Sequence, residues 1–289
     1  MVLAVAVALG GIFWAAWRWS RGPATDALPR LSLTQLLAQT PAEGWQLARL
    51  DSHPDLLVIQ FPDLLVQARA LNRAAALVEQ PDAPRDRVLD DAELSALIAR
   101  QKLTPETFYY GHDHTAQNLR RFFALAARQH IALTAEERQL ESILRQQGLL
   151  VPNGAGEQGP RQPASVLITF TRAQPGTGID AAMRASVARH ELSHGVYFTT
   201  PAYANHCRRF WHERLTAAER ERFVAYLERR GYNPRDNELM INEAQAFLMH
   251  STDPRAFSAA DLGVDDRTLD SMRRRFLAGA PPMDWAEPR

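Results

Sequence analysis

The sequence predicts a mainly α fold of the α+β class, in which many helices accompany a small β-sheet. Apolar residues recur at helical spacing through most of the chain after residue 30. Only two stretches, 55–61 and 164–173, have the composition of buried strands. The 289 residues are 46% hydrophobic and 23% charged, which is typical of a packed globular protein.

Residues 1–19 are predicted to be a membrane anchor or signal segment. The run from Met1 to Trp17 has no charged residue, and the tryptophans near its end suit the interface of a bilayer. A cleaved signal peptide has a basic start and small residues at its cleavage site, and this sequence has neither. We therefore expect an uncleaved anchor that binds the protein to a membrane.

Residues 20–45 are predicted to be a linker with a short helix, and residues 46–150 to be a mostly helical region. A strand at 55–61 and a helix at 62–80 open this region. Further helices are predicted at 89–100, 115–130 and 134–148 from helical periodicity and from Asp and Thr caps.

Residues 151–289 are predicted to form the second region. It begins with a loop rich in Gly and Pro at 151–163, and the most strand-like stretch of the chain follows at 164–173. The next segment is a helix that carries the sequence "VARHELSHGVYF". Three more helices are predicted at 203–213, 216–230 and 236–250.

Composition excludes some classes of partner and site. Thirty-three basic residues balance thirty-three acidic ones, so no net charge attracts nucleic acid, and we expect none as a partner. Lys102 is the only lysine, which is typical of a GC-rich bacterial genome. Because Cys207 is the only cysteine, a metal ion must be held by His, Glu or Asp.

The segment "HELSH" is a candidate metal-binding motif. Residues four apart lie on one face of a helix, so His190 and His194 can share one metal ion, and Glu191 lies beside them without having to bind it. Met183 and Val187 precede His190 at helical intervals, which indicates that this face points into the protein.

A third ligand is needed, because catalytic zinc sites use three protein groups and leave one position for water. The metzincin extension requires Gly and His where this chain has Tyr197 and Thr200, so that class is excluded. Glu243, in "NEAQA", is the better candidate. Its segment has helical periodicity, and the small Ala246 lets this helix pack closely on the motif helix.

"HELSH" followed on a later helix by "NEAQA" resembles the gluzincin zinc metallopeptidases, and the resemblance covers about 164–250. It implies that His190, His194 and Glu243 bind Zn²⁺ and that Glu191 is the catalytic base. It also implies a zincin-like catalytic domain at 151–289, in which an edge strand at 164–172 receives the substrate backbone. Phe247 stands where the thermolysin type has an acidic residue, so the carboxylate that orients a zinc-binding histidine is not assigned.

Other side chains are weaker candidates. His250 follows Glu243 by two helical turns and is predicted to be catalytic, as a donor to an oxyanion; the alternative is a histidine that stabilises the end of its helix. Tyr197 and Tyr203 are further candidate donors. His112, Asp113 and His114 are predicted to lie in a turn, as a solvated loop or as a metal or substrate contact. His206 and His212 are predicted to lie on the surface.

These observations predict a zinc-dependent metallopeptidase that hydrolyses peptide or protein substrates. The alternatives are a non-catalytic, membrane-anchored metal-binding or scaffold protein, and a membrane-tethered adaptor in which the motif is accidental. Arg18 and Arg21 favour a cytoplasmic domain, whereas a hydrophobic N-terminus on a bacterial peptidase more often exports it. We therefore expect anchoring in the bacterial inner membrane, with the catalytic domain in the periplasm.

Overall fold

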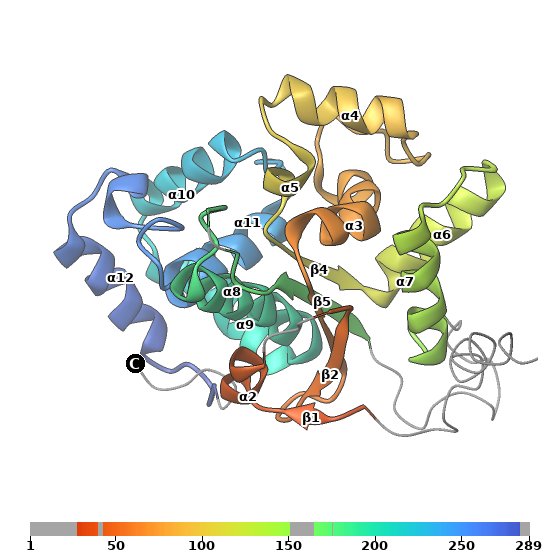
Figure 1. The fold of residues 1–289 in the computed structure, drawn as a ribbon. Helices are drawn as coiled ribbons and strands as arrows, with labels where there is room; N and C mark the ends of the chain where they lie inside the picture. The colour runs from red at the N-terminus through yellow and green to blue at the C-terminus, as the bar shows by residue number, and fades with distance from the viewer. Residues whose placement is uncertain (1–27, 40–42, 151–164, 175, 284–289) are drawn as a thin grey trace, which may run out of the picture.

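Figure 1 shows the fold in a computed structural model that describes residues 28–39, 43–150, 165–174 and 176–283. The described chain is mainly helical and contains a five-stranded mixed sheet, so the predicted fold class is confirmed. The strands lie in the order β1-β2-β3-β5-β4. Their bounds are β1 Arg30–Leu31, β2 Gln46–Leu50, β3 Leu56–Phe61, β4 Gly111–Thr115 and β5 Val166–Thr171.

Strand β5 lies inside the sheet. It runs parallel to β3 on one side and antiparallel to β4 on the other. The expectation that 164–172 would be an edge strand is therefore wrong, and β4 occupies that edge. The turn predicted around His112 is also wrong, because the segment "GHDHT" forms β4. It has no apolar alternation to indicate a strand, so its conformation depends on pairing with β5.

Side chains of the two central strands alternate between two hydrophobic cores, as the pleat of a sheet requires. Val58 and Ile168 belong to the first core, together with residues of the motif helix α8 (Ala181–Thr199). Leu57 and Leu167 belong to the second core, together with residues of α3 (Leu64–Glu79). The sheet is therefore covered by helices on both faces.

The second core is covered by helices from the first half of the chain. They are α3, α6 (Ala116–Arg128) and α7 (Ala135–Gln146), with α4 (Asp91–Arg100) and α5 (Pro105–Phe108) packed near α3. The side chains of Asp63, Asp90, Thr115 and Thr134 cap the longer helices by accepting a backbone N–H. The helices predicted between residues 62 and 148 are confirmed.

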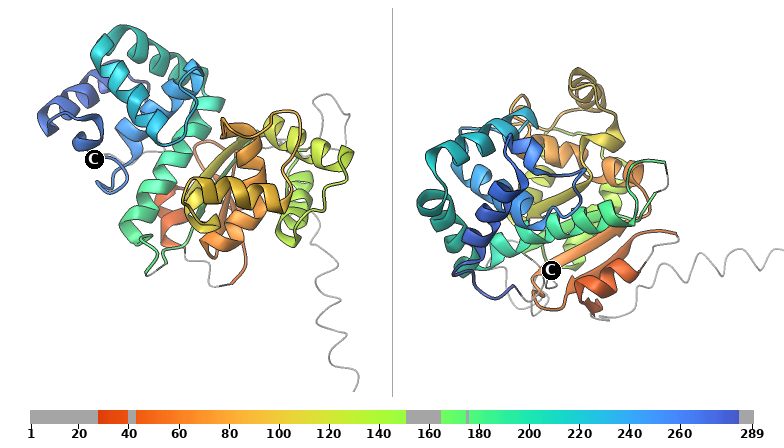
Figure 2. Two further views of the ribbon diagram at one scale, coloured as in Figure 1. Left: turned by 90° about the horizontal axis from the view of Figure 1, so that it is seen from above. Right: turned by 90° about the vertical axis from the view of Figure 1, so that its left-hand side faces the viewer.

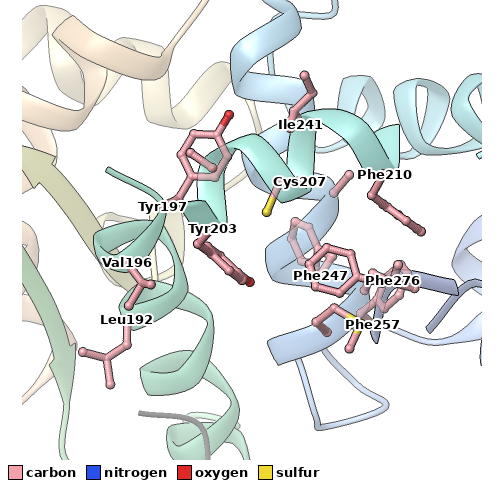
Figure 3. Close-up of a cluster of buried hydrophobic side chains, with 14 of the residues drawn as sticks. Leu192, Val196, Tyr197, Tyr203, Cys207, Phe210, Ile241, Phe247, Phe257 and Phe276 are labelled. Carbon is pink, nitrogen blue, oxygen red and sulfur yellow. The ribbon is translucent and has the colours of Figure 1, made fainter. Parts of the chain in front are cut away.

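The first core is covered by α8 and by helices from the C-terminal part of the chain, which Figure 2 shows in teal to blue. They are α9 (Pro201–Arg209), α10 (Ala217–Arg229), α11 (Asn237–Gln245) and α12 (Asp266–Leu277), with the π-helical turns η1 (Phe210–Arg214) and η2 (Ala246–His250) and the 3₁₀ turn η3 (Ala259–Leu262). Figure 3 shows side chains of this core from α8, α9 and η2, with Phe247 of η2 beside Phe257 and Phe276.

The predicted helices at 203–213, 216–230 and 236–250 are confirmed, as is the short helix, α2 (Leu33–Ala38). Strand β2 and helix α12 were not predicted.

Gly195, directly after the "HELSH" motif, sets how closely α8 packs on the sheet. A Cβ atom at this position would lie 2.8 Å from Leu56 Cδ1 and 3.1 Å from Ile168 Cδ1, which is closer than real Cβ contacts. The glycine therefore lets the motif helix lie directly on β3 and β5.

The regions predicted at 46–150 and 151–289 contribute strands to the same sheet, since β5 lies between β3 and β4. Their division into domains stays a prediction. The loop predicted at 151–163 and the anchor predicted at 1–19 lie outside the described residues.

The predicted localisation needs a correction. Within the part of the chain that the structure describes, none of the helices has the length and apolar character needed to cross a membrane. Even the 19-residue α8 carries Arg, His and Glu along its length. This finding does not fit a protein anchored in the bacterial inner membrane with a periplasmic domain, and that prediction is wrong.

Candidate metal centre

Helix α8 and helix α11 bring three potential metal ligands together. Glu243 Oε1 lies 3.6 Å from His194 Nε2, and Glu243 Oε2 lies 3.6 Å from His190 Nε2. Two ligands at 2.0–2.1 Å from a tetrahedral ion are about 3.3 Å apart, so this spacing fits a shared ion. The same distance is too long for a hydrogen bond. The side chains are 12%, 2% and 8% exposed for His190, His194 and Glu243. The three residues can therefore bind a metal ion.

The surroundings of the His190 and His194 rings favour the neutral protonation state, which is the state that binds metal. His190 Nδ1 lies 2.9 Å from Ser251 Oγ, which itself donates to the carbonyl of Ala246. The Ser251 hydroxyl therefore accepts a hydrogen bond from the Nδ1–H group, and the lone pair of His190 remains on Nε2, toward Glu243. Burial lowers the pKa of His190 to about 3 and that of His194 to about 4. Both rings are neutral at pH 7, as metal binding requires.

Asp113 is a candidate for the carboxylate that sequence reasoning left unassigned. Its Oδ2 lies 3.5 Å from Nδ1 of His194, on the side of the ring away from Glu243. A carboxylate only accepts hydrogen bonds, so it favours a proton on Nδ1 and a lone pair on Nε2. Asp113 comes from β4, where a single acidic residue between two histidines gives no sequence signal for this role.

Potential ligand atoms of Asp113, Glu191 and His194 also lie within 4.8 Å of one another. This group and the His190–His194–Glu243 group share His194. The His190–His194–Glu243 group is the better candidate metal site, because the Nε2 atoms of both histidines face Glu243. The Nδ1 atom of His194 faces Asp113 at 3.5 Å, without a hydrogen bond between them.

The exchange of Asp113 for Asn tests this assignment. We expect Asp113→Asn to weaken metal affinity by about 10- to 100-fold, the usual loss when an outer contact of a ligand is removed. Competition with a chelator of known affinity measures the change. Asp270→Asn is the matched control, because Asp270 lies on α12 and accepts a hydrogen bond from Arg273. This variant should bind metal like the parent. Unchanged affinity in Asp113→Asn would show that Asp113 does not orient His194.

Glu191 lies against the edge strand of the sheet. A Cβ atom at Gly111 would lie 2.5 Å from Glu191 Cγ and 2.6 Å from its Oε1. The carboxylate therefore occupies space that is open only because residue 111 has no side chain. Burial raises the pKa of Glu191 well above its usual value, and the negative charges of Glu243 and Glu79 add to this effect. A buried carboxylate with a raised pKa is suited to accept and return a proton.

Three of the side chains predicted to act on an oxyanion are engaged elsewhere. His250 Nε2 lies 2.9 Å from the hydroxyl of Tyr203, which donates to Gln245 Oε1 at 2.7 Å. The hydroxyl of Tyr197 donates to Glu238. Figure 3 shows Tyr203 within the first core. The catalytic role of His250 stays a prediction, since its Nε2 atom already contacts Tyr203.

Tyr232 is a residue that sequence reasoning missed. It lies in the turn after α10, where Gly231 has a φ of 92°. Its hydroxyl forms a hydrogen bond with the carboxylate of Glu243. Burial raises the pKa of Tyr232 well above its usual value, and the charge of Glu243 adds to this, so the phenol keeps its proton. A tyrosine in a turn gives no signal in the sequence.

Histidines outside the motif are more buried than expected. His112 and His114 point to the face of the sheet opposite Asp113, as alternation along β4 requires, and both are buried. Their ring nitrogens have no hydrogen-bond partner. His206 was predicted to lie on the surface, but it is buried, and its Nε2 donates to the carbonyl of Phe276.

We compared the chain with protein-family models, curated proteins and solved structures, and none of them matches it.

Proposed function

We propose that this protein is a zinc-dependent metallopeptidase of the gluzincin type, which hydrolyses peptide bonds with Glu191 as general base. The observation that carries this proposal is the convergence of His190, His194 and Glu243, with a fourth side chain, Glu191, beside them but turned to Gly111. A purely structural metal site has no use for a proton acceptor at this place.

The ligand set favours zinc. Two imidazole nitrogens and one carboxylate oxygen are a common set for catalytic zinc, which leaves the last position for water. Calcium and magnesium prefer sites made of oxygen atoms, and sulfur ligands are absent from this group. Zinc, when bound, supplies a Lewis acid that acidifies water and polarises the peptide carbonyl.

The chain's own residues then have separate roles. Glu191 accepts a proton from the attacking water and returns it to the leaving amine. Ser251 and Asp113 hold the rings of His190 and His194 in the orientation that binds metal. Tyr232 keeps its proton and is our candidate oxyanion donor, in a step that moves its hydrogen bond from Glu243 to the developing oxyanion.

Strand β4 is the proposed binding surface for the substrate backbone. It lies at the edge of the sheet in the described part of the chain, so one row of its backbone groups is open to pairing. An extended peptide that pairs with this edge passes Gly111, against which the Glu191 carboxylate lies. The role that the sequence suggested for β5 therefore belongs to β4.

Metal removal tests the proposed function. We expect a chelator to abolish cleavage of an unstructured protein such as casein, and one equivalent of Zn²⁺ per chain to restore it. Metal analysis and the appearance of peptide fragments are the measurements. Cleavage that persists in the metal-free protein would contradict the proposal, and so would the absence of cleavage by the zinc-loaded protein.

Gly111→Ala tests the position of the base. Its Cβ displaces the Glu191 carboxylate, and a shift of about 1 Å in a reacting group can lower the rate up to 100-fold. We expect kcat to fall at least about tenfold, while zinc content and the midpoint of thermal unfolding stay near those of the parent. Steady-state kinetics with a fluorogenic peptide measure this. A parent-like kcat would mean that catalysis does not depend on the position of the Glu191 carboxylate beside Gly111.

A further inference from the structure

Four carboxylates lie close together around the metal centre. Glu243 is a ligand, Glu191 and Asp113 adjoin His194, and Glu79 ends helix α3. Burial is the main cause of the raised pKa of Asp113, Glu191 and Glu79, and the negative charges of neighbouring carboxylates among the four add to it. Glu79 therefore belongs to the surroundings of the centre, although it binds no metal in the proposed site.

Protein cations compensate these carboxylates only weakly, because Arg85 acts on Glu79 and Arg230 acts on Glu243 without forming an ion pair. Within the described ranges, the ion pairs of Glu79, Asp113 and Glu243 are made with histidines, and none of the four carboxylates pairs with an Arg or Lys side chain. Burial raises the pKa of all four groups, and that of Glu79 to about 8, so at pH 7 they are fully ionised only when a cation binds beside them. An excess of negative charge in a buried site is costly unless a cation compensates for it.

The neighbours of Glu79 do not use all the hydrogen-bonding capacity of its carboxylate, so a ligand can bind there. The hydroxyl of Tyr109 forms a hydrogen bond with this carboxylate and accepts one from Gln80. His114 Nδ1 lies 4.0 Å from Glu79 Oε1. His114 is fully buried, its ring nitrogens have no hydrogen-bond partner, and burial lowers its pKa to about 4. The ring is therefore neutral at pH 7 and does not neutralise Glu79.

We propose that Glu79 and His114 bind a primary ammonium group of the substrate beside the metal centre. This inference rests on the proposed peptidase function and specifies its substrate class. An ammonium group has three donors, which suit one carboxylate oxygen and one neutral ring nitrogen. A guanidinium group prefers both oxygens of a carboxylate, and Tyr109 already uses this carboxylate. The Glu79 side chain is 17% exposed and that of His114 is fully buried, so a ligand would approach the pair from the side of Glu79.

The ammonium group has two sources, the N-terminus of a peptide and a lysine side chain. Two matched peptide pairs distinguish them: one sequence with a free or an acetylated N-terminus, and one acetylated sequence with lysine or norleucine near the cleaved bond. We expect the zinc-loaded protein to cleave the cationic member of one pair with a kcat/KM about 10- to 100-fold higher, the scale of a partly buried charge pair. The preferred pair identifies the source.

Glu79→Gln should abolish this preference through a higher KM for the cationic peptide, with little change for the neutral one. Glu141→Gln is the matched control, because Glu141 pairs with Arg145 on the surface of α7. Glu79→Asp keeps the charge and should keep part of the preference. Equal kcat/KM within both pairs, or a preference that survives in Glu79→Gln, would overturn the proposal. If Glu79→Gln fails to fold, the peptide pairs with the parent still decide.

Binding separates this inference from the proposed function. Zinc-loaded Glu191→Gln should bind the cationic peptide at least about tenfold more tightly than its neutral partner, as measured by fluorescence anisotropy. If the parent cleaves no peptide but this difference in affinity is present, the peptidase function fails and the ammonium site stands. If cleavage is present and neither affinity nor kcat/KM depends on charge, the ammonium site fails alone.

Discussion

Glu191→Gln is expected to keep its zinc and to lose peptide hydrolysis by roughly 100-fold or more, the usual scale for a lost general base. Glutamine has nearly the same shape as glutamate but cannot accept a proton from water. The residue is not a ligand in the assigned site, and its carboxylate packs against Gly111, so the substitution leaves the three ligands in place.

Zinc content and initial rates on casein measure both parts of this prediction. His190→Ala provides the contrast, because it should lose metal and activity together: two remaining ligands hold zinc poorly. If Glu191→Gln cleaves casein as fast as the parent, Glu191 is not the base and the proposed mechanism is wrong. If it loses its zinc, Glu191 helps to bind the metal, and the ligand assignment must change.

Glu243→Ala is expected to lower zinc affinity by at least about 100-fold, more than the loss expected for an outer contact such as Asp113. The substitution removes the only carboxylate whose oxygens lie 3.6 Å from Nε2 of both histidines in the described part of the chain. Activity should disappear at zinc concentrations that saturate the parent. Isothermal titration of the metal-free proteins with Zn²⁺ measures the affinity.

Glu238→Ala is the matched control on the same helix. Its carboxylate pairs with Arg208 and accepts a hydrogen bond from Tyr197, on the side away from the metal ligands. It should bind zinc like the parent. Parent-like affinity in Glu243→Ala would show that another carboxylate completes the site, with Asp113 and Glu191 the nearest candidates.

The helices were predictable because their signals are local. Apolar spacing and a capping residue determine where α7 begins, at Thr134, and where α10 begins, at Thr216. The same holds for the two central strands, most of whose buried residues are apolar. Strand β4 gave no such signal. Its residues are Gly, His, Asp and Thr, and its extended conformation is stabilised by the backbone ladder with β5, which is a long-range interaction.

The sequence by itself determined the motif helix and its chemistry. His190 and His194 are four residues apart, and the geometry of one helix places them on one face whatever surrounds it. Glu243 was chosen for the helical periodicity of its segment and for the small Ala246, and the resemblance to a known pattern supported that choice. The structure brings it to the two histidines through the packing of α11 near α8.

Only the tertiary structure decided which residues from the first half of the chain join the site. Gly111 and Asp113 reach α8 because β4 pairs with β5 at the sheet edge, and Gly195 lets α8 lie close to that sheet. Glu79 arrives there at the end of α3. The physical reason is that spacing along a chain encodes the period of a helix or strand, whereas the register of distant strands is set by the contacts of the whole core.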